Sequence, residues 1–109
     1  GLGADCAVVT DGKASGFCEG LYVVQVTPEA YVGGPLALLR DGDRIEIDIP
    51  NGRLQAEVSE SEFERRRRAW TPPEPAYDTG YRSLWIDQVT QAPEGCDFRF
   101  NVDRDWRNK

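Results

Sequence analysis

The clearest pattern in the chain is an alternation of apolar and polar residues between positions 44 and 59. Residues 45–49 (IEIDI) and 54–58 (LQAEV) both repeat with a period of two, and Pro50-Asn51-Gly52 lies between them. A period of two is typical of strands with one buried face, and an Asn-Gly pair is favoured in two-residue hairpin turns. We therefore predict a β-hairpin spanning residues 44–59.

Three other apolar runs predict short strands in the first part of the chain. Residues 5–10 (DCAVVT) and 21–27 (LYVVQVT) are rich in β-branched residues, and residues 35–39 (PLALL) follow the break at Gly33-Gly34. Such short runs bounded by turn residues are typical of buried strands. The intervening residues 28–31 (PEAY) begin with proline, which predicts a single helical turn.

Two helices are predicted in the second half of the chain. Ser59 and Glu62 have the S-x-x-E spacing of a capping box, so the first helix should begin there and end near Trp70, before a run of prolines. Asp78 or Thr79 can cap the second helix, which should stop before the Pro-Glu-Gly sequence at 93–95. Its apolar face is formed by Tyr81, Leu84, Trp85, Val89 and Ala92.

The last residues and the element order together predict a fold class. Phe98 and Phe100 alternate with polar residues before a polar end, which predicts a docked edge strand followed by a frayed terminus. Strands followed by helices predict a β-dominated α+β fold, with the helices grouped on one side of a small sheet or barrel. The length of 109 residues fits a single domain, residues 1–109. Because Gly1 precedes the first apolar run without a charged signal-like segment, we expect a domain of a longer enzyme.

The composition excludes several classes of function. Hydrophobic residues make up 39% of the chain and charged residues 29%, and no apolar run is long enough to span a bilayer. The net charge of −6 argues against a nucleic-acid surface, which needs clustered Lys and Arg side chains. The one basic run, Arg65–Arg68, follows three glutamates and predicts a solvent-exposed helix face. We therefore expect neither nucleic acid nor a membrane as a partner.

The cysteine and histidine counts narrow the possible chemistry further. Cys6, Cys18 and Cys96 are an odd number of cysteines without a CxxC pair, which indicates neither a disulfide framework nor a zinc site. A reducing, cytoplasmic location is expected. The chain has no histidine, which excludes Ser-His-Asp and Cys-His catalysis. Any chemistry must come from hydroxyls, carboxylates, lysines or backbone groups.

The candidate site is the glycine-rich loop at residues 10–16 (TDGKASG), which directly follows the first predicted strand. Glycines on both sides of Ser15 leave its hydroxyl and the nearby amides open to a ligand. The loop has neither a Walker A nor a GxGxxG nor a GxSxG sequence. From these residues alone, a structural turn and a ligand-binding loop are both possible.

In these residues the chain resembles the dihydroxy-acid and sugar-acid dehydratases, a family that includes phosphogluconate dehydratase. Residues 10–16 match the family's TDGR-x-SG loop, and Val26 to Asp43 match its H-V-[ST]-PEA-x-x-GGP-[IL]-A-x-[VL]-x-DGD block. The resemblance continues through the hairpin, the arginine-rich helix ending AWTPPEP and the following GY helix. Residues 89–100 (VTQAPEGCDFRF) resemble the ending of the sugar-acid members, which favours an aldonic acid over the valine and isoleucine precursors.

The resemblance implies the C-terminal domain of a hydro-lyase, folded as a swivelling β-barrel-like domain flanked by helices. It implies dehydration of a 2,3-dihydroxy acid to a 2-keto-3-deoxy acid with an iron-sulfur cluster and Mg²⁺. Ser15 would be the catalytic base that removes the C2 proton, while the cluster iron acts as a Lewis acid on the C3 hydroxyl. The residues implied in substrate binding are Thr10, Asp11, Lys13 and Gly16.

The resemblance also implies which groups lie outside this chain. The family's metal ligands are upstream of this region, so the chain alone should bind neither cofactor and should be inactive. Its three cysteines should then be small buried or half-buried residues. The expected partners are an N-terminal metal-binding domain, the sugar-acid substrate and further copies of the parent in a homo-oligomer. A surface facing the N-terminal domain is expected around Ser15 and Phe17.

Three positions depart from the family pattern. Lys13 replaces the usual Arg and keeps its charge but not its bidentate fork, Ala14 is smaller than usual, and Gln25 replaces a His. These departures and the absence of metal ligands motivate a second hypothesis, a free-standing binding or assembly module of the same fold without catalysis. Glu29 in the PEA turn is expected to have a structural role.

Overall fold

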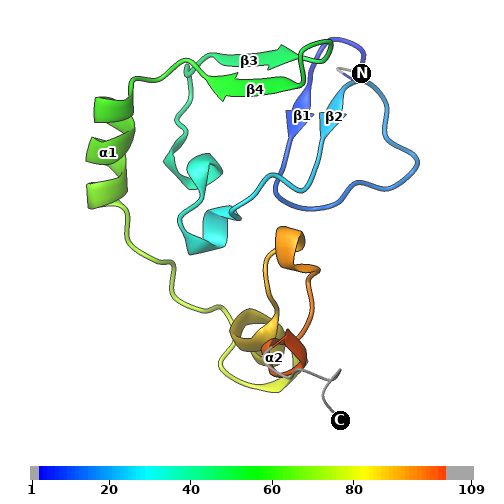
Figure 1. Cartoon of the computed structure of the whole chain (residues 1–109), viewed down its shortest axis with the longest axis vertical. Helices are drawn as coiled ribbons and strands as arrows, with labels where there is room; N and C mark the ends of the chain where they lie inside the picture. Colours follow the sequence, from blue (N-terminus) through cyan, green and yellow to red (C-terminus); the bar gives the residue numbers. More distant parts are fainter. Residues whose placement is uncertain (1–2, 103–109) are drawn as a thin grey trace.

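The computed structural model describes residues 3–102, which combine short strands with helices (Figure 1). Strands β1 (Val8–Val9) and β2 (Tyr22–Val23) pair in parallel, and β3 (Ile45–Asp48) and β4 (Arg53–Ala56) form a separate antiparallel pair. The mixture of helix and strand agrees with the sequence. Helical residues outnumber strand residues, however, so the described part of the chain is not β-dominated.

The expected barrel-like arrangement is not confirmed. Among the described residues the strands form two sheets of two strands each, and no strand pairing joins them into a closed ring. Closing a barrel requires every strand to be paired on both edges. Strands of two to four residues, each paired on one edge, cannot do this.

The predicted β-hairpin is confirmed, but its turn is longer than the Asn-Gly pair suggested. Four residues, Ile49 to Gly52, connect the two strands. The Asp48 carboxylate accepts hydrogen bonds from the backbone N–H of Asn51 at 3.3 Å and from its side-chain amide at 2.7 Å. Gly52 then takes a left-handed conformation with φ of 61°. The Asp48 carboxylate thus binds the N–H of a residue three positions later, which favours this four-residue turn.

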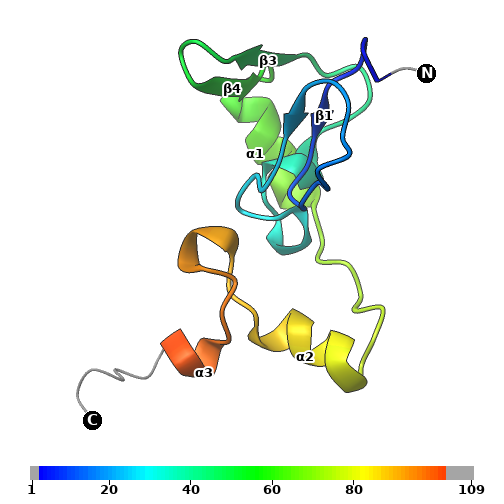
Figure 2. The same cartoon turned by 90° about the vertical axis from the view of Figure 1, so that its right-hand side faces the viewer.

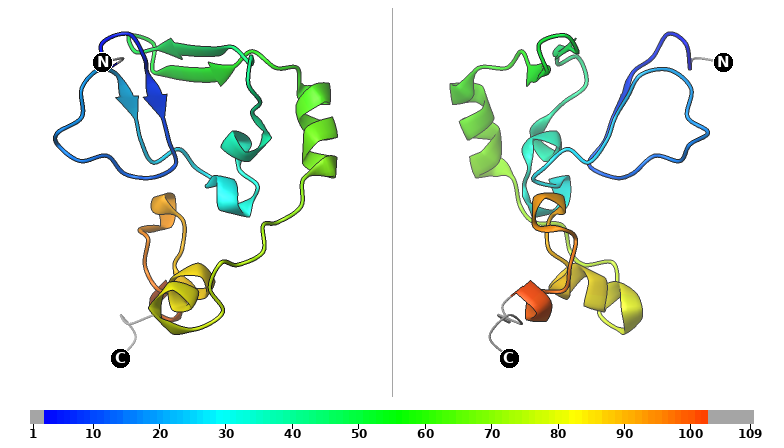
Figure 3. Two further views of the ribbon diagram at one scale, coloured as in Figure 1. Left: turned by 180° about the vertical axis from the view of Figure 1, so that it is seen from behind. Right: turned by 45° about the vertical axis from the view of Figure 1, so that its right-hand side comes forward.

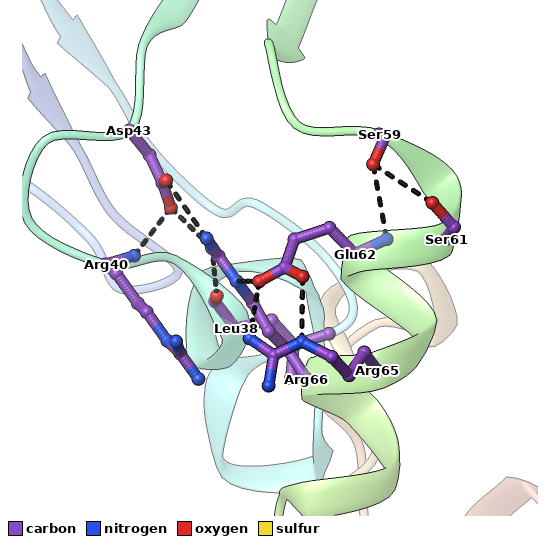
Figure 4. Close-up of polar contacts among 8 residues, drawn as sticks. All are labelled: Leu38, Arg40, Asp43, Ser59, Ser61, Glu62, Arg65 and Arg66. Atoms are coloured by element: carbon purple, nitrogen blue, oxygen red, sulfur yellow. Dashed lines mark hydrogen bonds and ion pairs between the residues drawn. The ribbon is translucent and has the colours of Figure 1, made fainter.

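Helix α1 (Glu60–Ala69) begins and ends where the sequence predicts. The Ser59 hydroxyl accepts the backbone N–H of Glu62 at 3.2 Å, as an N-cap residue does. The Glu62 carboxylate forms ion pairs with Arg65 and Arg66 (Figure 4). The Ser59 half of the predicted capping box is therefore present, whereas the Glu62 carboxylate pairs with two arginines of α1.

Arg66 contradicts the prediction of a solvent-exposed arginine face. Its side chain is 10% exposed, whereas those of Arg65 and Arg67 are 61% and 54% exposed. The Arg66 guanidinium donates to the Asp43 carboxylate at 2.6 Å and to the Leu38 carbonyl at 2.9 Å (Figure 4). A guanidinium with several donors can be covered because each donor finds an acceptor. Arg66 therefore attaches α1 to residues 38–43, the segment that runs from the end of η2 towards β3.

Two 3₁₀ helices follow β2: η1 (Ala30–Val32) and η2 (Pro35–Leu38). The first confirms the predicted helical turn. The second replaces the strand predicted at residues 35–39, because proline fits the first helical position and the Ala37 N–H bonds to the Gly34 carbonyl at 2.9 Å. Leu38, at 4% exposure, is the one buried apolar side chain among the described residues.

The C-terminal part of the described chain lies at the far end of an extended segment that leaves α1 (Figure 2). Its helices are α2 (Gly80–Gln88), η3 (Ala92–Glu94) and α3 (Arg99–Val102). Helix α2 confirms the second predicted helix but ends before Val89, and the side chain of Thr79 makes no capping bond. The predicted edge strand is wrong, because Phe98 forms only a single bridge with Val89 and Phe100 lies in α3. The predicted fraying beyond residue 102 lies outside the described residues.

The chain is less compact than a typical domain of its length. Its Cα radius of gyration is 17.0 Å, whereas a compact domain of this length has about 13 Å. Its accessible surface is 8801 Å², compared with about 6,000 Å² for a compact protein of this mass. No helix within residues 3–102 is long and apolar enough to cross a bilayer. Large apolar residues, among them Phe17, Ile49 and Tyr81, are exposed, so the chain by itself leaves apolar surface uncovered.

Candidate functional site

The glycine-rich loop connects β1 to β2 and projects from the rest of the chain in both views of Figure 3. Backbone hydrogen bonds order its base on both sides. The Thr10 N–H donates to the Val23 carbonyl at 2.9 Å, and the Gln25 N–H donates to the Gly12 carbonyl at 2.9 Å. The Thr10 hydroxyl also accepts the Gly12 N–H at 3.0 Å. The loop therefore leaves the sheet from a fixed base.

Gln25 follows β2, on the side where the loop returns to the sheet, and has an unusual backbone conformation. Its φ is 56°, a left-handed value that is uncommon for a residue other than glycine. This conformation accompanies the hydrogen bond from its N–H to Gly12 across the base of the loop. Gln25, one of the three positions that depart from the family pattern, thus contributes to the base of the loop through its backbone N–H.

Asp11 connects the base of the loop to η1. Its Oδ2 accepts the backbone N–H of Ala30 at 2.7 Å in a half-buried contact. The neighbouring N–H, that of Glu29, donates to Oε1 of Gln91 at 2.8 Å. Two side chains from distant segments thus hold consecutive N–H groups of the same turn.

The sequence did not single out Gln91 as a site residue, although Gln91 lies within residues 89–100, the ending that resembles the sugar-acid members. The residue is 62 positions from its partner Glu29, so only the folded chain brings the two together. Sequence did single out Glu29 as structural. The structure places it at the N-cap of η1, where its side chain makes no capping hydrogen bond.

The outer part of the loop carries Lys13, Ser15 and Gly16, all of which are exposed. The Ser15 carbonyl accepts a hydrogen bond from the Cys18 thiol at 2.8 Å, and the Phe17 side chain is 97% exposed. A Cβ added at Gly16 would meet nothing within 4 Å. The loop therefore has space for a ligand beside Ser15.

The five predicted site residues fall into two groups. Thr10 and Asp11 lie half-buried at the base of the loop, where both side chains accept backbone N–H groups. Lys13, Ser15 and Gly16 lie in the exposed outer part. The structure thus brings the five residues into one loop, but it separates those that anchor the loop from those that face solvent.

The described residues do not fit a metal ion or an iron-sulfur cluster. No group of three or more Cys, Asp or Glu side chains gathers as possible ligands within residues 3–102. Cys6 and Cys18 are exposed, so the expectation of buried or half-buried cysteines is wrong for these two, and it is confirmed for the half-buried Cys96. Cys6 precedes β1 and Cys18 lies in the projecting loop between β1 and β2, and no other described element covers either segment.

The strongest electrostatic feature lies away from the loop, around Arg66. Hydrogen bonds from Arg65 and Arg66 lower the pKa of Glu62 to about 2. A hydrogen bond from Arg66, followed by one from the Arg40 backbone N–H, lowers the pKa of Asp43. These contacts stabilise the charged forms of both carboxylates. Since Arg66 also binds the Leu38 carbonyl, the cluster joins α1 to the segment 38–43.

A hollow of about 720 Å³ lies between η1 and the C-terminal part, and its lining includes Glu29, Trp85, Gln91 and Arg99. None of the five predicted site residues lines it. A smaller hollow of about 280 Å³ is largely apolar. It is lined by residues that include Val9, Val26, Leu36, Leu39, Leu54 and Phe63. The smaller hollow is an apolar centre that the described chain leaves open.

Comparison with known proteins matches most of the chain to one family. The family described as "Dihydroxy-acid/6-phosphogluconate dehydratase C-terminal" matches residues 1–96. A dihydroxy-acid dehydratase of Picrophilus torridus and one of Metallosphaera sedula are each 52% identical over 96 residues. A dihydroxy-acid dehydratase of Thermus thermophilus is 47% identical over 96 residues. In each case the match covers 88% of this chain and 17% of the relative.

Proposed function

This chain belongs to the dihydroxy-acid/6-phosphogluconate dehydratase C-terminal family, and we propose that it supplies the Ser15 loop to the active site of a dehydratase. The observation that supports the proposal is the loop itself. Its base is fixed by Thr10 and Asp11, while Ser15 lies in the exposed outer part with open space at Gly16. A serine held in this way can be presented to a substrate bound outside the chain.

The proposed reaction removes water from a 2,3-dihydroxy acid. The Ser15 oxygen takes the proton from C2, the hydroxyl group leaves from C3, and the resulting enol rearranges to the 2-keto-3-deoxy acid. Thr10, Lys13 and Gly16 would contact the substrate, with the ammonium of Lys13 facing its carboxylate. A serine hydroxyl is a weak base in water, so positive charge from outside the described residues must favour its deprotonated form.

The iron-sulfur cluster and Mg²⁺ belong to this proposal through the family resemblance alone. When bound, such groups supply a Lewis acid for the leaving hydroxyl. The resemblance implies that their ligands lie upstream of this region, so we propose that the remainder of the parent protein holds both groups. The role left to this chain is to supply and orient the base.

The proposed partner is the N-terminal part of the same enzyme. The chain spans 17% of the length of the relatives it matches, and its surface is larger than that of a compact protein of its mass. Phe17, two residues from Ser15, is 97% exposed, and the apolar hollow near Val9 and Phe63 is open. Uncovered apolar surface of this kind favours a permanent interface. A homo-oligomeric parent and a cytoplasmic location stay predictions.

The substrate is proposed as a 2,3-dihydroxy acid, and the ending at residues 89–100 favours an aldonate. The relatives are named dihydroxy-acid dehydratases, which supports the class of substrate without deciding between an aldonate and a branched-chain acid. The two classes of substrate can be distinguished by measuring kcat/KM of the parent enzyme on an aldonate and on a branched 2,3-dihydroxy acid. A higher kcat/KM on the branched acid would overturn the aldonate preference.

The test of the proposed function is Ser15→Ala in the complete parent enzyme, with keto-acid formation as the assay. Loss of a general base should lower kcat by roughly 10²- to 10⁴-fold. Ser61→Ala is a matched control, because Ser61 is an exposed serine on α1 that lies outside the loop. Undiminished turnover in Ser15→Ala would remove the base assignment. An intact parent without activity on any dihydroxy acid would favour the non-catalytic module instead.

A further inference from the structure

We propose that Asp11 and Gln91 are positioning residues that fix the place of Ser15 by holding the Pro28–Ala30 turn between them. Asp11 belongs to the base of the Ser15 loop, and Gln91 belongs to the C-terminal part of the chain. Their side-chain oxygens accept two consecutive backbone N–H groups of the turn, at 2.7 and 2.8 Å. The inference rests on the proposed role of Ser15.

The two contacts satisfy backbone groups that the short helix η1 cannot satisfy by itself. The first N–H groups of any helix lack a partner within the helix. A residue at the N-cap commonly supplies an acceptor, but Glu29 occupies that position without a side-chain capping bond. Asp11 and Gln91 supply the acceptors instead, from 19 and 62 residues away. This distant capping joins three segments that are separate in sequence.

The turn is a rigid element and can therefore define a position. The Glu29 carbonyl accepts the N–H groups of Val32 at 3.1 Å and Gly34 at 3.0 Å. A Cβ added at Gly34 would lie 1.8 Å from the Pro28 carbonyl oxygen, so the two backbone segments are packed directly against each other. A segment fixed in this way can fix the side chains that bind to it.

A short stretch of chain, from Asp11 to Ser15, connects the Pro28–Ala30 turn to the proposed base. Asp11 is followed by Gly12, which is held by the Thr10 hydroxyl and by the Gln25 N–H. Ser15 follows three residues later, in the exposed outer part of the loop. Release of Asp11 from the turn would let the base of the loop shift, and a displacement of about 1 Å at a reacting group can cost on the order of 10²-fold in rate.

The competing interpretation is that Asp11 binds substrate directly, as the family resemblance implies. A substrate ligand should affect KM, since it contacts the substrate in the ground state. A positioning residue should lower kcat and leave KM largely unchanged, because the substrate contacts remain while the base is misplaced. The kcat and KM values of Asp11 variants therefore distinguish the two roles.

The experiment compares variants of the complete parent enzyme. We expect Asp11→Ala and Gln91→Leu each to lower kcat at least tenfold, with KM changed less than threefold. Asp11→Asn and Gln91→Glu keep an acceptor oxygen and should restore most of the rate. Thr90→Val is the matched control beside Gln91, because the Thr90 hydroxyl accepts the Asp97 N–H at 3.1 Å and does not reach the turn. It should leave kcat within twofold of the parent value.

A second readout is hydrogen–deuterium exchange of the peptide spanning residues 28–32. Exchange should be faster in Asp11→Ala and in Gln91→Leu, because each variant frees one N–H group, and unchanged in Thr90→Val. The Asp11→Ala/Gln91→Leu double variant should lower kcat less than the product of the two single effects, because both act on one turn.

Three outcomes would overturn the inference. They are a raised KM with kcat retained in Asp11→Ala, equal losses of kcat in Gln91→Leu and Thr90→Val, and unchanged exchange at residues 28–32. A failed Ser15→Ala test would instead remove the base assignment and the link to Ser15. The exchange measurement would then still report whether Asp11 and Gln91 hold the turn.

Discussion

Gly34 offers the sharpest test of the packing around the Pro28–Ala30 turn. Its φ of −63° and ψ of 169° are open to any residue, so a change to alanine brings no backbone strain. The added Cβ would lie 1.8 Å from the Pro28 carbonyl oxygen, 2.5 Å from its carbon and 2.8 Å from the Glu29 oxygen. All three are backbone atoms, which cannot rotate away as a flexible side chain can. Gly34→Ala must therefore displace the turn.

The size of this effect follows from the distances. Non-bonded carbon atoms are most favourably separated by about 3.5–4.0 Å, so the turn must move by more than about 1 Å. Overpacking that shifts backbone costs about 1–3 kcal/mol and occasionally more, and we expect about 3 kcal/mol or above for Gly34→Ala. Gly42→Ala is the control, because nothing lies within 4 Å of its added Cβ and only the φ of 91° is unfavourable. A left-handed conformation costs about 1–2 kcal/mol.

The assay is urea denaturation of the chain and its two variants, followed by far-UV circular dichroism and tryptophan fluorescence. Gly34→Ala should lower the free energy of unfolding by more than Gly42→Ala does. If Gly34→Ala costs no more than Gly42→Ala, the close packing of the turn against Gly34 is refuted. The support that this packing gives to the proposed role of Asp11 would then be lost as well.

Three further predictions concern α1 and the loop. Ser59→Ala should lower the free energy of unfolding by about 1 kcal/mol, measured by urea denaturation, because the Glu62 N–H loses its N-cap acceptor. Hydrogen bonds from Arg65 and Arg66 lower the pKa of Glu62 from 4.5 to about 2, so the stability they give is present above pH 4.5 and is lost as the pH falls towards 2. Denaturation at a series of pH values should show this decline, and Arg66→Leu should weaken it. Gly16→Ala should change the free energy of unfolding by less than about 0.5 kcal/mol, because no atom lies within 4 Å of the added Cβ, yet it should reduce turnover of the parent if substrate binds at the loop.

The parts of the fold that the sequence predicted correctly are those decided by neighbouring residues. The alternation at residues 44–59 predicted the hairpin, since the period of two directly reflects which side chains share a face. Ser59 and the prolines after Trp70 predicted both ends of α1, because capping and the loss of an N–H act over only a few positions. The loop at residues 10–16 was likewise identified from its glycines and from the resemblance of its flanking blocks.

The errors arose where short elements compete or where distant segments meet. Residues 35–39 have the composition of a strand, but within residues 3–102 they pair with no strand, and the proline starts a 3₁₀ helix instead. Phe98 and Phe100 alternate as in a strand, yet a single bridge to Val89 is all that forms. Strand pairing depends on a partner elsewhere in the chain, which an apolar pattern alone does not reveal.

The sequence by itself determined the family, the hairpin, α1 and the place of Ser15 in a glycine-rich loop, because each depends on residue order within a short stretch. Only the tertiary structure decided that Arg66 is covered, that Asp11 caps Ala30 and that Gln91 caps Glu29. Each of these contacts satisfies a charge or a backbone N–H group with an acceptor far away in the sequence. Such partners are selected by the need to pair buried polar groups, and that need exists only once the chain has folded.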